Sequence, residues 1–249
     1  MLIVAHRGYS SRYPENTALA FEKAIEAGAD YIETDLRLSR DGVVVCCHDP
    51  DLKRIAGQTD TIAESDSAML RNVTMADGQS LLRLDDVLAI ARGRSGVMLD
   101  VKVTTDEMAE RALPSIEAAG MMANVMYGTR DREHAVLMKR RAAELTVLGM
   151  PGHPAQIRDF IAAGVDAIRV WEEEMTAQIV SAVHDAGKRL WVTAGLRRYG
   201  ETVGSITAER LRTLRALGAD AVLVNDPSLG RRDGEKTNQR KRMQERMPS

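Results

Sequence analysis

The most informative residues are charged side chains placed two apart on otherwise apolar runs. Glu33 and Asp35 lie in one such run, and Asp100 and Lys102 lie at the end of another. Side chains two apart on an extended strand point the same way, and burying them without ions or partners is costly. Three carboxylates without a thiolate make a hard oxygen site. They predict binding of one divalent cation, Mg²⁺ or Ca²⁺.

Two histidines stand in comparable positions. His6 is followed by Arg7 at the end of the first apolar run, and His48 is followed by Asp49 after an extension of the second. One histidine can remove a proton from a nucleophile while the other protonates a leaving alkoxide. A divalent cation can polarise a phosphoryl oxygen, and Arg7 and Lys102 can stabilise negative charge on it. Together these residues indicate phosphoryl chemistry.

Each of these residues has a structural interpretation when it is taken singly. A lone histidine is more often structural or exposed than catalytic. Glu33 and Asp35 could face solvent on an alternating strand, and Asp100 could simply pair with Lys102 at a strand end. Their coincidence at one predicted barrel rim favours chemistry, because catalytic groups of barrel enzymes lie at the carboxyl ends of the strands.

The elements that must position these residues alternate regularly, as in an α/β protein with a (β/α)₈ TIM barrel. The predicted strands are Leu2–Ala5, Tyr31–Leu36, Val97–Val101, Val125–Tyr127, Leu145–Leu148, Ala167–Val170, Leu190–Thr193 and Ala221–Val224. The predicted helices begin with an apolar face over residues 18–25, capped by Asn16 or Thr17. The others lie near Asp86–Ala91, Asp106–Ala118, Arg132–Ala143, Ala155–Ala162, Thr176–Ala186 and Ala208–Ala216.

Two stretches interrupt this alternation. Val43–Cys47 is expected to form an extra strand that extends the second one after a turn at residues 40–42. The segment from Asp49 to about Arg83 is expected to form a small excursion over one end of the barrel. Neither stretch indicates a second domain, so we expect one domain over residues 1–249, ending in a polar tail from about residue 231.

Composition narrows the class of protein. The formal net charge of the 249 residues is −2, which gives no reason to expect nucleic acid as a partner. The two cysteines are adjacent and form no disulfide framework. No signal core precedes His6, and no apolar run is long enough to insert into a membrane, so we expect a cytoplasmic protein. The Lys- and Arg-rich tail favours a subunit contact, and hence a homo-oligomer.

The order of the motifs resembles the glycerophosphodiester phosphodiesterase family. His6-Arg7-Gly8, Pro14-Glu15-Asn16-Thr17, Glu33-x-Asp35 and His48-Asp49 appear in the order and spacing of that family, most clearly over residues 2–55. The resemblance implies that Glu33, Asp35 and Asp100 bind the metal and that the two histidines form an acid–base pair. It also implies metal-dependent hydrolysis of a small glycerophosphodiester to glycerol 3-phosphate and an alcohol, with the glycerol hydroxyl attacking first to give a cyclic phosphate.

Three positions depart from the family pattern. Asp100 stands where Glu is usual, Trp191-Val192-Thr193-Ala194 replaces a Trp-Thr-Val-Asn-like stretch, and Asn225-Asp226 replaces a Thr-Asp pair. These departures predict an unusual alcohol-binding side of the pocket. Residues that could line it, although packing is the simpler interpretation, are Tyr127, Trp171, Trp191 and Arg197. We expect His134 and His184 to be exposed on helices and His153 to have a loop role.

Two other functions compete with the leading one. A related phospholipase D-type enzyme or lyase could act on sphingomyelin or lysolipids, since such enzymes resemble this family and use Asp at the position of Asp100. A non-catalytic barrel could instead bind phosphodiesters through the metal site. The presence of both His6 and His48 argues against pure binding, which requires no acid–base pair. The sequence names neither the alcohol headgroup nor the choice between Mg²⁺ and Ca²⁺.

Overall fold

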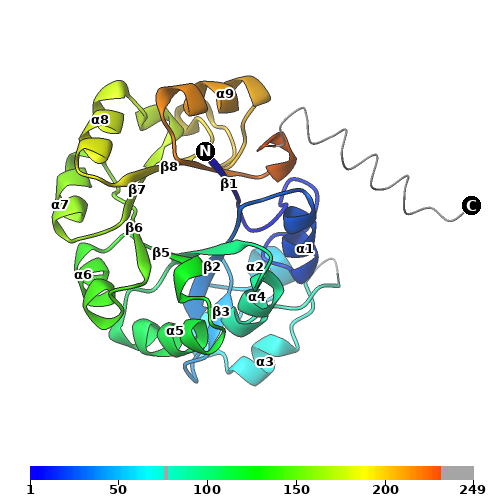
Figure 1. The fold of residues 1–249 in the computed structure, drawn as a ribbon. Helices are drawn as coiled ribbons and strands as arrows, with labels where there is room; N and C mark the ends of the chain where they lie inside the picture. The colour runs from blue at the N-terminus through cyan, green and yellow to red at the C-terminus, as the bar shows by residue number, and fades with distance from the viewer. Residues whose placement is uncertain (76–77, 231–249) are drawn as a thin grey trace, which may run out of the picture.

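Eight parallel strands close into a barrel in the computed structural model, which describes residues 1–75 and 78–230 (Figure 1). The first strand pairs with both the second and the last, so the described sheet has no open edge between them. The barrel strands are β1 (Leu2–Ala5), β2 (Tyr31–Leu38), β4 (Gly96–Val101), β5 (Val125–Thr129), β6 (Thr146–Gly149), β7 (Ala167–Trp171), β8 (Arg189–Thr193) and β9 (Ala221–Val224). The predicted TIM barrel is confirmed.

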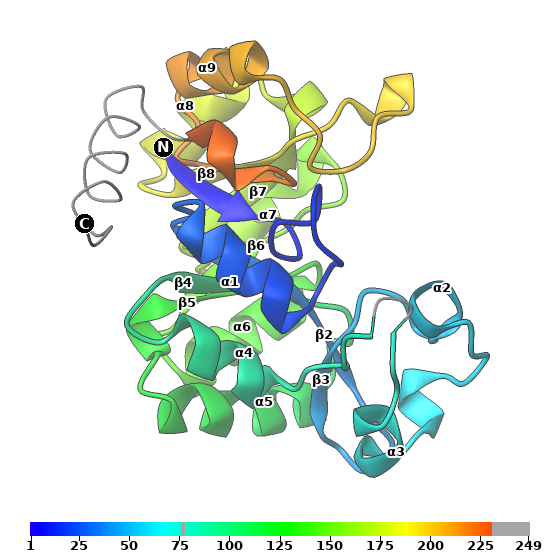
Figure 2. The ribbon, with the colours of Figure 1, turned by 90° about the vertical axis from the view of Figure 1, so that its right-hand side faces the viewer.

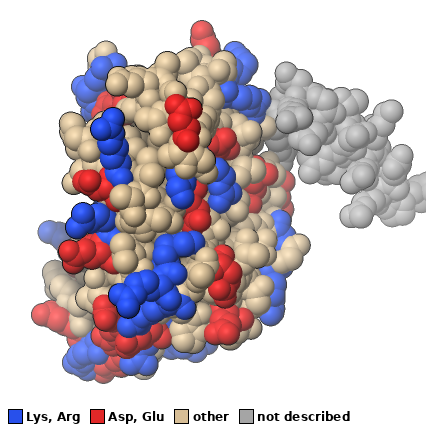
Figure 3. Space-filling view, turned by 60° about the vertical axis from the view of Figure 1, so that its left-hand side comes forward, with Lys and Arg blue, Asp and Glu red and all other residues tan. Residues whose placement is uncertain are grey.

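The helices form a ring outside the strands (Figure 1). They are α1 (Ala18–Glu26), α4 (Leu84–Ala91), α5 (Asp106–Ala118), α6 (Arg132–Arg141), α7 (Ile157–Ala162), α8 (Ala177–Asp185) and α9 (Ala208–Leu217). Of the two capping residues considered for α1, Thr17 is the one that accepts a hydrogen bond from the N–H of Ala20. Figure 3 shows the side that carries the helices on the left of Figure 1, where acidic and basic side chains are interspersed.

Two apolar layers hold this ring together. Outward-facing strand residues such as Ile32 and Val97 pack against the helices, whereas a smaller cluster fills the barrel interior with residues that include Val4, Met98 and Trp191. Alternation along each strand separates the two layers. The interior positions become polar toward the carboxyl ends of the strands, and there the residues singled out in the sequence are found.

The expected excursion is confirmed beside β2. Strand β3 (Val44–Cys46) pairs antiparallel with β2, and α2 (Lys53–Ala56) and α3 (Ser67–Arg71) follow it at one side of the barrel (Figure 2). This segment has an apolar cluster of its own, which includes Cys47, whereas Cys46 packs into the main core. The two cysteines therefore face opposite ways, as expected, and they are free thiols.

Two features bear on the other sequence-based expectations. Residues 231–249, the polar tail on which the homo-oligomer was expected, lie outside the described residues. Among the described residues, no helix has the length and apolar character needed to cross a membrane.

A tight turn after β1 generates the first prediction. Gly8 has a φ of +81°, and a Cβ at this position would lie 2.7 Å from the carbonyl carbon of Ala20. Gly28 has a similar φ of +89° with nothing within 4 Å of such a Cβ. Gly28→Ala should cost about 1–2 kcal/mol of unfolding free energy for the left-handed backbone alone. Gly8→Ala should cost about 1–3 kcal/mol more because of the clash.

Urea unfolding of both variants measures this difference. Equal losses of stability would mean that the turn after β1 moves away from α1 without cost, contrary to the packing described.

Candidate active site

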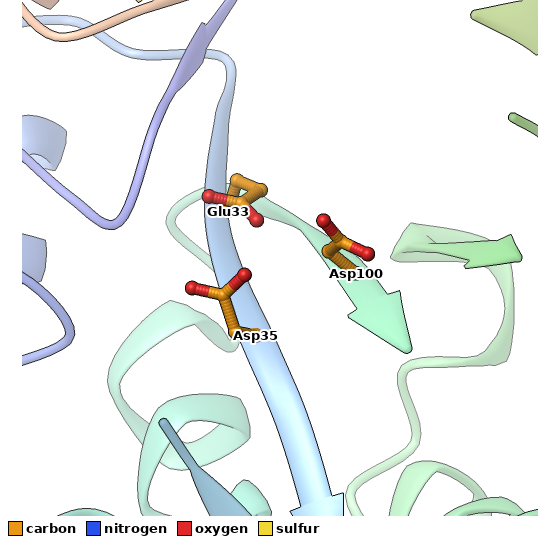
Figure 4. Close-up of side chains that lie close together, drawn as sticks. All are labelled: Glu33, Asp35 and Asp100. Atoms are coloured by element: carbon orange, nitrogen blue, oxygen red, sulfur yellow. The ribbon is translucent and has the colours of Figure 1, made fainter. Parts of the chain in front are cut away.

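Three buried carboxylates meet at the carboxyl end of β2 and β4 (Figure 4). Glu33 and Asp35 are each 1% exposed and Asp100 is 8% exposed. One oxygen atom from each lies within 4.8 Å of the others. The barrel register explains the convergence, because Asp35 on β2 is the direct partner of Asp100 on β4. Both alternation and register are needed, and the sequence alone supplies only the first.

The three carboxylates differ in how many cationic partners they have. Lys102 lies 2.7 Å from Asp100 Oδ2 and 2.9 Å from Asp35 Oδ1. Arg130, two residues beyond Gly128 on β5, donates to both oxygens of Asp100. Although burial disfavours the charged form of Asp100, Arg130 and Lys102 lower the pKa of this carboxyl. The suggested Asp100–Lys102 ion pair is therefore present, and it coexists with the carboxylate cluster.

Glu33 is in the opposite situation. Burial, followed by the charges of Asp35 and Asp100, raises the pKa of the Glu33 carboxyl well above its ordinary value. Among the described residues, its carboxylate accepts a hydrogen bond from the backbone N–H of Arg7 to Oε2, at 2.8 Å. Because the local cations do not offset its charge, Glu33 is the carboxylate that gains most from a nearby divalent ion.

The donor set fits a hard divalent cation. Asp35 Oδ1 is buried and accepts no hydrogen bond with proper geometry from the described residues. Its other oxygen accepts from Asn16 Nδ2 at 3.0 Å and lies 3.2 Å from Arg7 Nε. A buried oxygen with an unused lone pair, beside two more carboxylates, is a suitable ligand for Mg²⁺ or Ca²⁺. Glu33, Asp35 and Asp100 are the residues that would hold the ion.

The loop after β1 adopts an unusual backbone to serve this cluster. Arg7 and Asn16 both have positive φ, at 54° and 55°. Such a conformation is uncommon outside glycine, and it directs the Arg7 N–H to Glu33. The Asn16 amide bridges Asp35 to Thr34, whose hydroxyl donates to Asn16 Oδ1 at 2.8 Å. Asn16 of the Pro-Glu-Asn-Thr motif thus belongs to the site, a role that the sequence did not predict.

His6 is buried at the end of β1, and Asn225 orients its ring. The Asn225 amide nitrogen donates to the Val203 carbonyl at 2.7 Å, which turns its oxygen toward His6 Nδ1 at 2.8 Å. Nδ1 is therefore the protonated nitrogen, and Nε2 keeps its lone pair. Burial, and then the charge of Arg7, lowers the pKa of His6 to about 4. Asn225, one of the departures from the family pattern, thus orients the His6 ring, which the sequence did not predict.

His48 is held by a carboxylate instead of an amide. Its Nδ1 donates to Asp49 Oδ1 at 2.6 Å, and Asp49 Oδ2 lies 2.5 Å from Arg54 Nε. Arg54 also contacts Glu15 at 2.8 Å, and Glu15 contacts Arg7 at 3.1 Å. Although partial burial opposes it, the hydrogen bonds from Arg54 and His48 lower the pKa of Asp49. This chain of ion pairs links the excursion to the loop after β1.

A cleft of about 940 Å³ opens beside the carboxylates. His48 and Lys102 line it, together with Arg130 and residues of the β6–α7 segment such as Gln156 and Phe160. Basic side chains and one of the two histidines therefore face a space large enough for a small diester. Arg130 was not among the residues singled out from the sequence. It lies two residues after Gly128, at the end of an apolar strand, and Lys102 follows Asp100 with the same spacing.

The remaining histidines and Tyr127 lie away from the carboxylate cluster. The expectation that His134 is exposed is wrong: it is 3% exposed, and Tyr127, which is also buried, contacts its Nε2 at 2.9 Å. Tyr127 faces outward from β5 and packs against α6, away from the opening at the carboxyl ends of the strands. His184 is exposed, and His153 accepts a hydrogen bond from Ala155 in its loop. Both therefore match their expected places.

The tryptophans differ from each other. Trp191 fills the barrel interior and contacts Tyr31, with ring centroids 5.4 Å apart. Trp171 is half-buried at the end of β7. The guanidinium of Arg197 lies 3.9 Å from its ring centroid, and this arginine also pairs with Glu173.

Comparisons with known proteins agree with this geometry. The model of the glycerophosphoryl diester phosphodiesterase family matches residues 6–135, about half of the chain. "Probable glycerophosphodiester phosphodiesterase 2" of Mycobacterium tuberculosis is 34% identical over 57% of this chain, but the match spans only 54% of that protein. A glycerophosphodiester phosphodiesterase of Bacillus altitudinis is 24% identical over 90% of this chain and 94% of its own length.

Among solved structures, the glycerophosphodiester phosphodiesterase of Thermotoga maritima has a TM-score of 0.76 and 25% identity. The superposition covers 92% of this chain and 96% of the other. The matched segment of the family model contains both histidines and the three carboxylates that the barrel brings to one rim. The chain therefore belongs to the glycerophosphoryl diester phosphodiesterase family.

Proposed function

We propose that this protein hydrolyses glycerophosphodiesters to glycerol 3-phosphate and an alcohol, with one divalent cation bound by Glu33, Asp35 and Asp100. The observation that carries the proposal is the convergence of three buried carboxylates within 4.8 Å beside a cleft lined by His48 and Lys102. When bound, the cation supplies Lewis acidity toward a phosphoryl oxygen. The names of the relatives point to the same substrate class.

The two histidines carry the protons in this proposal. Nε2 of His6, with its lone pair available, removes the proton from the attacking hydroxyl, and Nε2 of protonated His48 gives a proton to the leaving alkoxide. The new bond joins the attacking oxygen to phosphorus as the bond from phosphorus to the leaving oxygen breaks. Asn225 and Asp49 fix the ring orientation of their respective histidines, as the buried Asp does in a serine-protease triad.

Arg7 and Lys102 stabilise the phosphoryl charge. Both lie within 3.2 Å of Asp35, so they stand beside the carboxylates that would hold the cation. Their positive charges face the position of the scissile phosphate, where negative charge increases as the new bond forms. The attacking hydroxyl is that of the glycerol, giving a cyclic phosphate that water then opens.

A release assay tests the function. Glycerol 3-phosphate should be released from glycerophosphocholine, glycerophosphoethanolamine and glycerophosphoinositol, and EDTA should abolish the release. Cleavage of lysophosphatidylcholine in preference to these diesters would instead support the phospholipase D-type alternative. Tight, metal-dependent binding of the diesters without any product would identify a non-catalytic barrel.

Metal binding should stabilise the fold. A cation that binds only the folded protein, present at 100 times its dissociation constant, adds about 2.7 kcal/mol to the free energy of unfolding. Thermal melts in EDTA and in excess Mg²⁺ or Ca²⁺ should differ accordingly. The difference should shrink in Glu33→Gln, which keeps the shape of the side chain and removes its charge. Superimposable melts of the unmodified protein would disprove the metal site.

The histidine pair makes a second prediction. His6→Ala and His48→Ala should each lower turnover about 10²–10⁴-fold. The double variant should lose far less than the product of the two, because the residues act as one unit. Metal affinity should stay unchanged in all three. His184→Ala, an exposed histidine on α8, is the control and should keep full turnover. A single variant with normal turnover would remove that histidine from the mechanism.

The shortened ligand at Asp100 makes a third prediction. Asp100→Ala should weaken metal affinity in calorimetric titrations, and excess metal should partly restore turnover. Asp100→Glu should keep the metal site, because it retains the carboxylate on a longer stem. Lys102→Ala should leave metal affinity nearly intact while lowering turnover. If Asp100→Ala binds metal as tightly as the unmodified protein, Asp100 is not a ligand and serves only to hold Lys102 and Arg130.

A further inference from the structure

An unpaired arginine is buried in the wall of the barrel mouth opposite the carboxylates. Arg169 is 5% exposed, and its Nη1 is buried without a hydrogen-bond partner. Across residues 1–75 and 78–230, no ion pair or hydrogen bond involving the Arg169 side chain is found. Its guanidinium contacts the Trp171 ring, 4.5 Å from the centroid. A buried cation without an anionic partner costs free energy, and one aromatic contact offsets it only in part.

The strand pattern directs Arg169 into the mouth. Ala167, two residues before it on β7, belongs to the cluster that fills the barrel interior, so Arg169 faces inward one layer closer to the carboxyl end. Its register partner Trp191 also lies in that interior cluster. Strand β7 stands four positions from β2 in the closed barrel, so Arg169 faces the carboxylates from the opposite wall.

The neighbouring arginines are already paired. Arg130 donates to Asp100, and Arg197 pairs with Glu173. Burial and then the charge of Arg130 lower the pKa of Arg169 to about 10, although the charges of Asp100 and Glu174 oppose this shift. The side chain therefore remains cationic at neutral pH. Arg7 and Lys102 already stand beside the carboxylates, where we place the scissile phosphate. Arg169 therefore remains available for an anion at the other end of the substrate.

We propose that Arg169 forms a subsite for a second anionic group, a carboxylate or a phosphate, on the leaving alcohol of the diester. This inference rests on the proposed function and refines its substrate class. A guanidinium matches the planar, two-oxygen shape of a carboxylate and can bind it through two hydrogen bonds. A site built to pair a buried charge also rejects an analogue that lacks the partner, because the charge is then left unpaired.

Two diesters that differ by one carboxylate test the subsite. Glycerophosphoserine and glycerophosphoethanolamine share the phosphodiester and the ammonium group, and only the serine diester has the carboxylate. The unmodified enzyme should have the higher kcat/KM for the serine diester. In Arg169→Met this preference should fall about 10-fold or more, the loss expected for a hydrogen-bonded ion pair. The kcat/KM for the ethanolamine diester should change less than about twofold.

Matched variants separate recognition from structure. Arg169→Lys keeps the charge and should keep part of the preference for the serine diester. Arg197→Met removes the other guanidinium that contacts Trp171 and should leave the preference unchanged. Arg169→Met should not lower the melting temperature, because it replaces an unpaired buried cation with an apolar side chain. A lowered melting temperature with an unchanged preference would assign Arg169 a structural role only and overturn the proposal.

The remaining outcomes are also decisive. An equal loss of kcat/KM for both diesters would place Arg169 at the scissile phosphate and overturn the second subsite. Equal use of the two diesters by the unmodified enzyme would likewise overturn it, while leaving the proposed function in place. If the unmodified enzyme hydrolyses neither diester nor glycerophosphocholine, the proposed function is wrong and the subsite falls with it.

Discussion

The mutual repulsion of three buried carboxylates is the constraint on which the rest of this structure depends. Glu33, Asp35 and Asp100 are buried and bring oxygens within 4.8 Å of one another. Burial, and then the charges of Asp35 and Asp100, raise the pKa of Glu33 well above its ordinary value. The neighbouring cations relieve Asp100 first. The remaining charge is what a divalent ion would neutralise.

The loop after β1 and the excursion also contact the carboxylate cluster or its neighbours. The positive φ of Arg7 turns an N–H toward Glu33, and the positive φ of Asn16 accompanies an amide bonded to Asp35. The side chain of Arg7 continues outward through Glu15 to Arg54, and from there to Asp49. A local unfolding of the excursion would therefore disturb both His48 and the surroundings of the three carboxylates. The ion pairs join this peripheral segment to the rim of the barrel.

The barrel mouth is electrostatically asymmetric. Carboxylates cluster on β2 and β4, whereas the opposite wall carries the unpaired Arg169 beside Trp171. A phosphodiester bound between them would have its scissile phosphate near the cation ligands and its alcohol toward the basic wall.

The sequence alone determined the alternation of strands and helices, the excursion and the identity of the rim residues. Those features follow from local periodicity, and the spacing of Glu33 with Asp35 indicates a common direction. Only the tertiary structure decided that Asp35 is the partner of Asp100, because register depends on how separate strands pair. The roles of Arg130, Asn225 and Arg169 escaped prediction for a related reason. Arg130 meets Asp100 of the neighbouring strand and Asn225 meets His6 from the other end of the chain, whereas Arg169 stands out because its Nη1 has no partner. None of these relations follows from local sequence.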